Sequence, residues 1–307
     1  RVSLAYQLTD KLSYNFNAGR YFQLPPYTVL GYKAGDVLVN KQNDVTYISS
    51  NHWVTGFEYN LSSTGRITLE GYYKTYQNYP FLLREQISLA NLGGDFGVIG
   101  NEPVTSTSEG RTYGLELLFQ QRLFKGFYGI LAYTFGKSEF SNVDGQFAAS
   151  SWDSRHIINL TMGKRFGKNW ELGVRYRLQA GLPFTPFSPT SDLVVNWNRN
   201  FGGIPDYNKI NSLRSDAFNG LDIRLDKKWF FKNWDLNIFL DIQNVTGSAI
   251  GRDVLLLDRP LDENLKPIGG PIVTNPSAPV DEQRYKVKTI NDAAGTLLPT
   301  IGIVISL

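Results

Sequence analysis

The stretch W-D-L-N-I-F-L-D-I-Q, from Trp234 to Gln243, alternates between apolar and polar residues along most of its length. The apolar positions are Trp234, Leu236, Ile238, Leu240 and Ile242, and the polar positions are Asp235, Asn237, Asp241 and Gln243. Successive side chains of a β-strand point to opposite faces of its sheet. The segment therefore predicts a strand with one apolar face and one polar face.

Alternating segments of about ten residues recur from one end of the chain to the other. We count about eleven, a length and pattern typical of tilted strands that cross a bilayer with one face in lipid and one in water. They cover residues 2–8, 12–21, 52–61, 66–79, 111–122, 127–139, 155–166, 170–180, 219–229, 234–244 and 298–307. The repeat predicts an all-β fold, a transmembrane antiparallel β-barrel with a wet lumen.

The connections between these segments alternate strictly between short and long. The short ones are residues 9–11, 62–65, 124–126, 167–169 and 231–233, and the long ones are 22–51, 80–110, 140–154, 181–218 and 245–297. Short periplasmic turns and long extracellular loops are typical of bacterial outer-membrane barrels. Aromatic residues flank the short turns and predict an interfacial girdle there. They are Phe166, Trp170, Trp229, Phe230 and Trp234.

The number of strands indicates whether this chain contains a whole barrel. Single-chain bacterial barrels have an even number of strands with both ends in the periplasm, so we expect at least one strand upstream of this chain. If eleven strands are half, the whole is the 22-stranded barrel of a plugged transporter. Arg1 leads directly into an alternating segment, with no signal peptide before it. We therefore expect residues 1–307 to be part of a longer polypeptide.

Composition excludes several classes of protein. No apolar run approaches the 18 or so residues of a membrane helix. The chain has no cysteine, so it holds neither a disulfide framework nor a thiolate metal site. A formal net charge of +3 with dispersed basic residues does not favour nucleic-acid binding. Soluble propellers and sandwiches also contain many strands, but we find no blade-length repeat, and long loops on one side only favour the barrel.

A Ser, a His and an Asp lie close together between Asp153 and His156, as in a hydrolase. Neighbouring strand residues point to opposite faces, so sequence proximity does not make a triad. We expect a structural role instead, with Trp152 at the outer interface and Asp153 paired with Arg155 near the rim. No catalytic residue is predicted.

Two further patterns concern possible binding of a metal ion or a phosphate group. His52 is the only other histidine, and no further metal ligands stand at suitable spacing. The glycine-rich stretch Gly93–Gly100 lacks the strand and helix context of a phosphate-binding loop and is predicted to be an ordinary loop. We predict neither a metal site nor a cofactor.

Several longer motifs resemble one known family over essentially the whole chain. They are G-R-Y-F-Q-L-P-P-Y (19–27), S-W-D-S-R-H-I-I-N-L (151–160), G-K-N-W-E-L-G-V-R-Y-R (167–177), G-L-P-F-T-P (181–186), L-D-I-R-L-D-K-K-W (221–229), L-D-I-Q-N-V-T (240–246) and P-T-I-G-I-V-I-S-L (299–307). In order and spacing the chain resembles the C-terminal half of the barrel of TonB-dependent outer-membrane receptors. Two departures are that these residues include no plug domain or TonB box, and that the chain ends in Leu307 where many outer-membrane proteins end in Phe.

The resemblance implies a function and a set of partners. Such receptors import scarce nutrients, namely iron chelates, cobalamin, carbohydrates or peptides, with energy supplied through TonB. The implied partners are outer-membrane lipid, the receptor's own plug domain and TonB, the last through an upstream segment. Two alternatives remain open: a receptor-like barrel that acts as a scaffold or secretion module with surface lipoproteins, and a barrel enzyme of the phospholipase type.

Two groups of residues are candidates for contact with a substrate. The first is the polar face of the strands, which we expect to meet the plug or a water-filled lumen: Glu58, Glu70, Lys74, Glu116, Arg165, Arg175, Arg177, Asp222, Arg224, Asp226, Asp235 and Asp241. The second is a set of aromatic residues in the long loops, since flat rings suit sugars and chelates. These are Tyr27, Tyr32, Phe187, Trp197, Phe201 and Tyr207.

Overall fold

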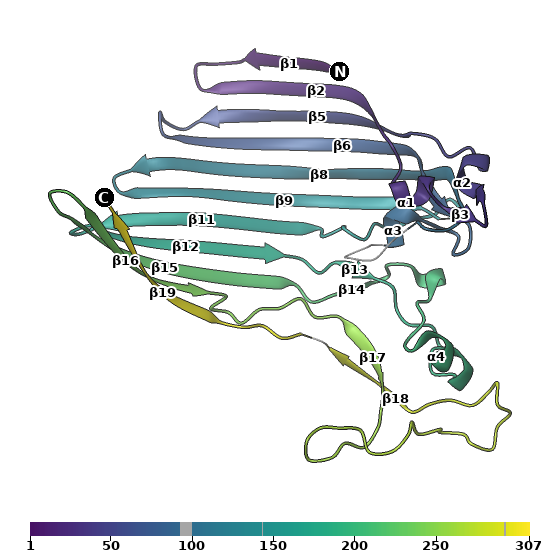
Figure 1. Cartoon of the computed structure of the whole chain (residues 1–307). Helices are drawn as coiled ribbons and strands as arrows, with labels where there is room; N and C mark the ends of the chain where they lie inside the picture. Colours follow the sequence, from purple (N-terminus) through teal and green to yellow (C-terminus); the bar gives the residue numbers. More distant parts are fainter. Residues whose placement is uncertain (93–99, 143, 292) are drawn as a thin grey trace.

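A computed structural model describes residues 1–92, 100–142, 144–291 and 293–307. Eleven antiparallel strands follow one another in chain order across one sheet, as Figure 1 shows. They are β1 (Val2–Gln7), β2 (Leu12–Gln23), β5 (Ile48–Asn60), β6 (Gly65–Leu82), β8 (Val104–Phe124), β9 (Phe127–Ser141), β11 (His156–Phe166), β12 (Trp170–Gln179), β15 (Phe218–Phe230), β16 (Asp235–Gln243) and β19 (Leu298–Ser306). All eleven predicted strands are present. Among the described residues no pairing joins β1 to β19, so the sheet is open.

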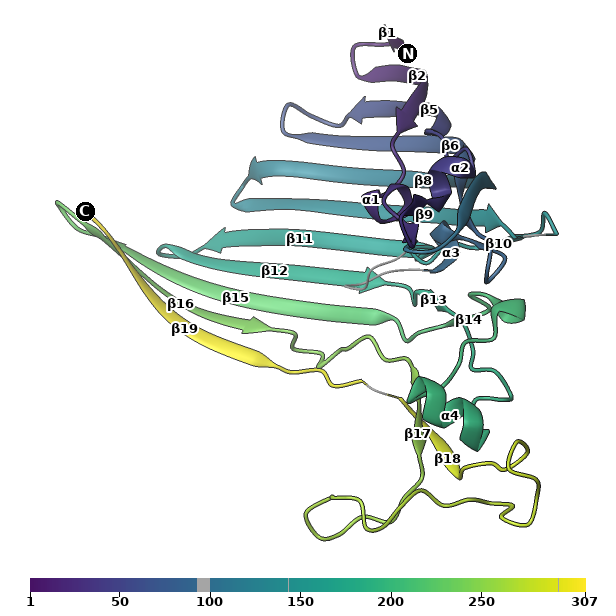
Figure 2. The ribbon, with the colours of Figure 1, turned by 45° about the vertical axis from the view of Figure 1, so that its right-hand side comes forward.

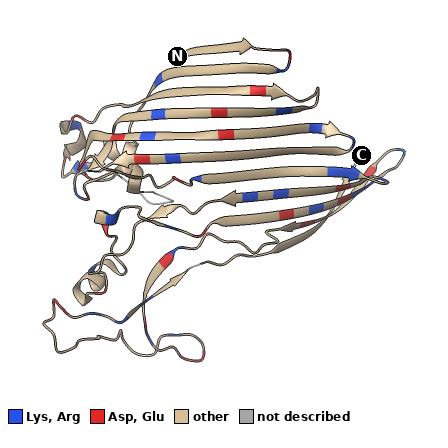
Figure 3. Ribbon diagram, turned by 180° about the vertical axis from the view of Figure 1, so that it is seen from behind, with Lys and Arg blue, Asp and Glu red and all other residues tan. Residues whose placement is uncertain are grey.

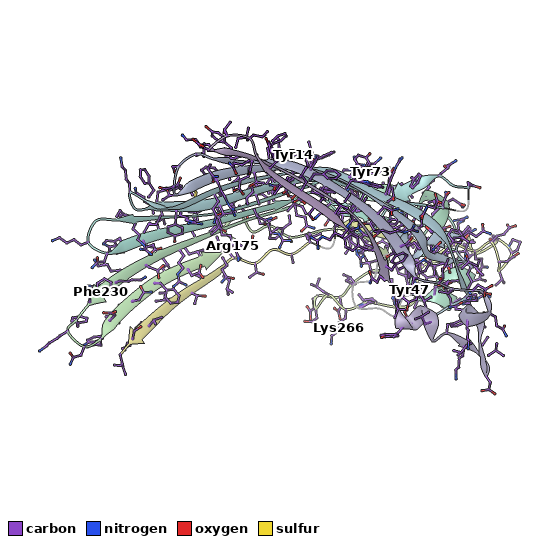
Figure 4. The ribbon with its side chains drawn as sticks, turned by 90° about the horizontal axis from the view of Figure 1, so that it is seen from above. Tyr14, Tyr47, Tyr73, Arg175, Phe230 and Lys266 are labelled. Atoms are coloured by element: carbon purple, nitrogen blue, oxygen red, sulfur yellow. The ribbon has the colours of Figure 1, made fainter. Side chains whose placement is uncertain are left out.

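Strand register places the apolar residues of successive strands on one face. Leu225 in β15 lies opposite Leu172 in β12 and Leu240 in β16, and Leu240 lies opposite Ile301 in β19. The alternation read from the sequence is thus kept in register across neighbouring strands, which builds a continuous apolar wall. Figure 4 shows the sheet as an arch, with Tyr14 and Tyr73 on its convex side and Arg175 on its concave side.

One end of the sheet carries only tight turns. The turn between β8 and β9 has positive φ at Lys125 (49°) and Gly126 (76°), the conformation that fits two-residue hairpins to the twist of their strands. A Cβ at Gly126 would lie 2.6 Å from the carbonyl oxygen of Arg165, so glycine is required there for space as well. The short connections predicted from the sequence are confirmed.

Exposed aromatic rings gather at this turn end. Phe166 and Trp170 lie directly opposite each other in register, and Nζ of Lys227 lies 5.3 Å from the Trp170 ring and 5.4 Å from the Trp229 ring. The rings of Phe231 and Trp234 stack with centroids 4.2 Å apart. A band of rings with a cation between them suits the depth of lipid headgroups.

The other end of the sheet carries all the long connections and every helix, as Figure 2 shows. The helical segments are α1 (Tyr27–Leu30), α2 (Val39–Gln42), α3 (Leu89–Leu92), α4 (Val194–Asn200) and the 3-10 turn η1 (Tyr207–Lys209). The short strands are β3 (Lys33–Ala34), β4 (Val37–Leu38), β7 (Ile87–Ser88), β10 (Phe147–Ala149), β13 (Pro183–Phe184), β14 (Leu213–Arg214), β17 (Asp253–Leu257) and β18 (Val287–Asn291). None of the described helices is long and apolar enough to traverse a bilayer.

Several strands extend further toward this loop end than the sequence predicted. β5 begins at Ile48 and β8 at Val104, several residues before the first clear alternation. In the β8 extension Val104, Ser108 and Gly110 are buried while Thr107 and Glu109 are exposed, so burial there does not follow residue polarity, and the sequence pattern alone does not mark the strand. Most of the glycine-rich stretch Gly93–Gly100 lies outside the described residues.

Candidate functional site

The predicted polar residues of the strands all lie on one face of the sheet. Register places Glu70 opposite Glu116, Arg175 opposite Asp222, and Arg224 opposite Asp241. Arg175, labelled in Figure 4, lies on the concave side. The concave side therefore carries all of the predicted polar residues of the strands, as expected for a water-filled or protein-filled lumen.

Residues of opposite charge are interleaved along the strands, as Figure 3 shows. Close pairs on the concave face include Arg175 with Asp222 (Nη2 to Oδ2, 2.6 Å), Arg224 with Asp226 (2.9 Å) and Arg165 with Glu171 (3.2 Å). The arginines are about half exposed, so each pair on its own adds little stability. Together they form a hydrated wall of balanced charge that does not commit the lumen to ligands of one sign.

The loop end has a hydrophobic core of its own. Val29, Leu82, Ile87, Leu89 and Val104 are buried against one another, although they come from three separate stretches of the chain. Burial of this kind stabilises at roughly 25 cal/mol per Å² of apolar surface. The first loops are thus packed as a unit above the strands.

A buried asparagine fastens the same loops through hydrogen bonds. Nδ2 of Asn40 donates to the carbonyl oxygens of Val29 (2.7 Å) and Glu102 (2.9 Å), and its Oδ1 accepts from the backbone N–H of Val104 (2.8 Å). Asn40 has no exposed surface, so losing these bonds would leave buried polar groups unpaired. The geometry of the loops is therefore specified by side chains as well as by packing.

Asp153 joins two further loops to the end of β9. Its side chain is fully buried; it accepts hydrogen bonds from the backbone N–H of Ser138 (2.8 Å) and from Nε of Arg155 (3.2 Å), and it pairs with Arg214. Arg214 also donates to the carbonyl oxygen of Gly181 (2.9 Å). The predicted pairing of Asp153 with Arg155 is confirmed, and Arg214 is a partner that sequence proximity could not reveal.

The Ser and His of the same segment do not form a catalytic pair. The hydroxyl of Ser154 donates to the carbonyl oxygen of Ala180 (2.9 Å), while Nδ1 of His156 lies 3.0 Å from the hydroxyl of Tyr133. A serine nucleophile needs a hydrogen bond to its base. Within the described residues, no group of three His, Cys, Asp or Glu side chains is arranged to hold a metal ion.

The six aromatic candidates lie in the loop end but do not form one patch. Tyr27 (83% exposed) and Phe201 (89%) are open to solvent, whereas Trp197 is buried (8%). Tyr207 is half-buried against the loop core, and burial is the main cause that raises the pKa of its phenol. The Tyr32 hydroxyl accepts from Nη2 of Arg84 at 3.4 Å.

Phe187 is the candidate that lines a cavity. This cavity of about 360 Å³ lies between the β17–β18 hairpin on one side and, on the other, the paired strands β13 and β14 with the loop that follows β13. Its lining includes Phe184, Leu213 and Leu255 as well as Phe187. Sequence reasoning treated residues 245–297 as one loop and missed the hairpin. The β-branched and leucine-rich segments 253–257 and 287–291 were the available signal.

Comparison with known proteins gives one family and one fold. The family model described as "TonB dependent receptor-like, beta-barrel" matches residues 1–245. No curated protein matches the chain in sequence.

Solved structures with a similar arrangement of strands include three iron-uptake receptors. The ferric-catecholate import receptor Fiu of E. coli K12 has a TM-score of 0.56, with 14% identity over 81% of this chain and 30% of that receptor. The ferripyoverdine receptor of Pseudomonas aeruginosa has a TM-score of 0.56, with 13% identity over 81% of this chain and 29% of that receptor. The ferric yersiniabactin uptake receptor FyuA of Yersinia pestis has a TM-score of 0.54, with 12% identity over 99% of this chain and 36% of that receptor. The chain spans about a third of the length of each, and identities this low establish the fold alone.

Proposed function

The chain belongs to the TonB-dependent receptor β-barrel family, and from this we propose that it is the C-terminal part of an outer-membrane receptor that actively imports a nutrient. Residues 1–307 supply eleven strands of a barrel, which we propose is 22-stranded when complete. A plug domain and further strands, encoded elsewhere in the polypeptide, would fill and close it.

The observation that carries this proposal is the packed loop end above a charged concave wall. The loops are held together by their hydrophobic core, by the hydrogen bonds of Asn40 and by the ion pairs of Asp153. They therefore form a preorganised surface rather than independent flexible loops. Preorganised surfaces bind ligands at a lower entropic cost. In the proposed mechanism this surface captures the nutrient, and TonB then supplies energy to rearrange the plug on the concave side.

The two ends of the sheet differ in the length of their connections, and this difference suggests the orientation of the barrel in the membrane. We propose that the loop end is extracellular and the turn end periplasmic, because long loops face outward in bacterial outer-membrane barrels. The bundle of aromatic rings near Trp170 would then mark the periplasmic headgroup layer.

The relatives suggest candidate nutrients. The three structures above are named as receptors for ferric catecholate, ferripyoverdine and ferric yersiniabactin, so ferric chelates belong among the nutrients tested first. Carbohydrates, cobalamin and peptides belong there too, because the balanced concave wall does not select ligands by charge.

Uptake measurements test the import function. A strain lacking the full-length receptor should lose accumulation of one labelled nutrient from this set, and deleting TonB in the wild-type strain should abolish the same accumulation. Accumulation that survives loss of TonB contradicts active import. Reading the polypeptide upstream of Arg1 is an independent check, since a receptor of this kind needs a plug domain there.

A further inference from the structure

The cavity beside Phe187 is held open by hydrogen bonds at two ends. At one end Arg284 pairs with Asp192 and its Nη1 donates to the carbonyl oxygen of Pro189 (2.9 Å), while the backbone N–H of Tyr285 donates to the carbonyl oxygen of Asp192 (2.8 Å). At the other end, the N–H of Asp216 donates to the carbonyl oxygen of Gly251 at 2.9 Å. The two hairpins are therefore fixed relative to each other.

Between these two groups of hydrogen bonds, the β17–β18 hairpin presents one face to the cavity. Register pairs Leu255 with Thr289 and Asp253 with Asn291, so Asp253, Leu255 and Thr289 lie on the same side. All three line the cavity. A strand pair that offers a carboxylate, an aliphatic side chain and a hydroxyl in a row can contact both polar and apolar parts of one ligand.

The ring of Phe187 is held in place by a glycine. A Cβ at Gly203 would lie 2.4 Å from the Phe187 ring, so the ring packs directly on the Gly203 backbone. An isolated bridge between Phe187 and Pro205 fixes the backbone beside it. The cavity thus has an aromatic wall that packs directly on the backbone, to which Phe184 adds a second ring.

The charge of the lining disfavours anions. Its charged residues are the carboxylates Asp192 and Asp253, and neither Lys nor Arg contributes to it. Asp192 is neutralised by Arg284, whereas Asp253 is exposed and makes no ion pair with any described residue. A carboxylate accepts hydroxyl hydrogen bonds that are about twice as strong as neutral ones, but it repels an anionic chelate at the same distance.

From these observations we propose that the cavity is a ligand subsite for a neutral, hydroxyl-rich ligand, an oligosaccharide. In this assignment Phe187 stacks on the apolar face of a sugar ring, and Asp253 and Thr289 bind its hydroxyls. A volume of about 360 Å³ lies at the small end of the range of ligand pockets, so the cavity holds part of a longer chain of sugars. The inference rests on the import function proposed above and names the class of nutrient.

The test is binding of the purified full-length receptor to an array of neutral, anionic and cationic oligosaccharides, with ferric citrate as a separate anionic probe. We expect binding to neutral oligosaccharides. Phe187→Ala should weaken that binding about tenfold, equivalent to about 1.4 kcal/mol. Asp253→Asn should weaken it by a smaller factor, because the amide retains one oxygen acceptor.

Matched controls separate the subsite from general effects of substitution. Tyr47 is an exposed loop aromatic (53%) outside the cavity, and Asp36 lies in the β3–β4 turn, so Tyr47→Ala and Asp36→Asn should bind like the wild type. Asp253 is exposed, so its variant reports on binding even if Phe187→Ala folds poorly. Folding of each variant is checked by the heat-dependent gel mobility of the barrel.

Three results would overturn the assignment. They are the absence of binding to any neutral oligosaccharide, binding unchanged by both cavity variants, or binding restricted to charged probes. TonB-dependent uptake of a ferric chelate with no oligosaccharide binding would refute the subsite and leave the import function intact. If the wild-type receptor supported no TonB-dependent uptake of any tested nutrient, the import function itself would be refuted.

Discussion

A single arginine placed on the convex face should destabilise the barrel far more than the same residue one position away. Leu69 lies on that face, 47% exposed, between Phe57 and Leu117 on the neighbouring strands. Thr68 precedes it on the concave face, next to Glu58. The two positions share one depth along the strand and differ in the medium that we expect them to face.

The depth of Leu69 sets the expected cost. Leu69 lies four positions after Gly65 at the turn and four positions before Tyr73, which stacks with Tyr113 at a centroid distance of 6.3 Å. At about 3.4 Å per residue, the span from Gly65 to Tyr73 is about 27 Å, or roughly 21 Å after a tilt of about 40°. Leu69 therefore lies near the bilayer midplane, where an arginine costs about 2–4 kcal/mol.

The assay is urea unfolding of the full-length receptor from phosphatidylcholine vesicles, followed by tryptophan fluorescence. Leu69→Arg should lower the folding equilibrium constant about 30- to 700-fold, at about 1.4 kcal/mol per factor of ten. Thr68→Arg should leave it close to the wild-type value, because the new cation lies in water beside Glu58. Equal losses for both variants, or a larger loss for Thr68→Arg, would refute the assignment of the faces.

Two further predictions concern the loop end. Asp153→Ala should destabilise the loops by about 3 kcal/mol, because Arg214 loses its buried partner; limited proteolysis of the folded receptor should cut residues 144–155 and 181–217 faster, and unchanged cleavage would contradict the role of Asp153 in joining these loops. Burial, a hydrogen bond with Glu85 and the charge of that residue raise the pKa of Glu102 to about 7. The folded state therefore retains a proton that the unfolded chain releases near pH 4.5, so the stabilisation is complete below that pH and is lost as the pH rises to about 7. Hydrogen exchange in residues 83–92 and 100–103, corrected for intrinsic rates, should be slower at pH 5.5 than at pH 8 in the wild type and should lose this dependence in Glu102→Gln; an equal dependence in both would contradict the assignment.

The strands were predictable because their chemistry is local and repeated. Each membrane-facing position must be apolar whatever the rest of the chain does, so alternation such as that from Leu236 to Ile242 is visible without any tertiary information. Tight turns carry an equally local signal, as the positive φ angles at Lys125 and Gly126 illustrate. Register followed from these two features.

The loop end was not predictable in the same way. The partners of Asp153 come from segments up to 61 residues apart, and those of Asn40 from up to 64. Elements of two to seven residues such as β13 and α4 form because tertiary contacts hold them, and local propensity says little about elements so short. This is why Trp197, chosen as a surface aromatic, turns out to be buried while Phe187 lines a cavity.

Cysteine labelling in intact cells tests the central claim, a barrel that spans the outer membrane with its loop end outside. This part of the receptor contains no native cysteine, so single cysteines can be placed at Phe201 in the loop end and at Lys168 in a short turn, with any cysteine elsewhere in the full-length receptor replaced. A membrane-impermeant maleimide should label the cysteine at position 201 in intact cells and the one at position 168 only after the outer membrane is permeabilised. Labelling of position 168 in intact cells, with position 201 protected, would contradict the account.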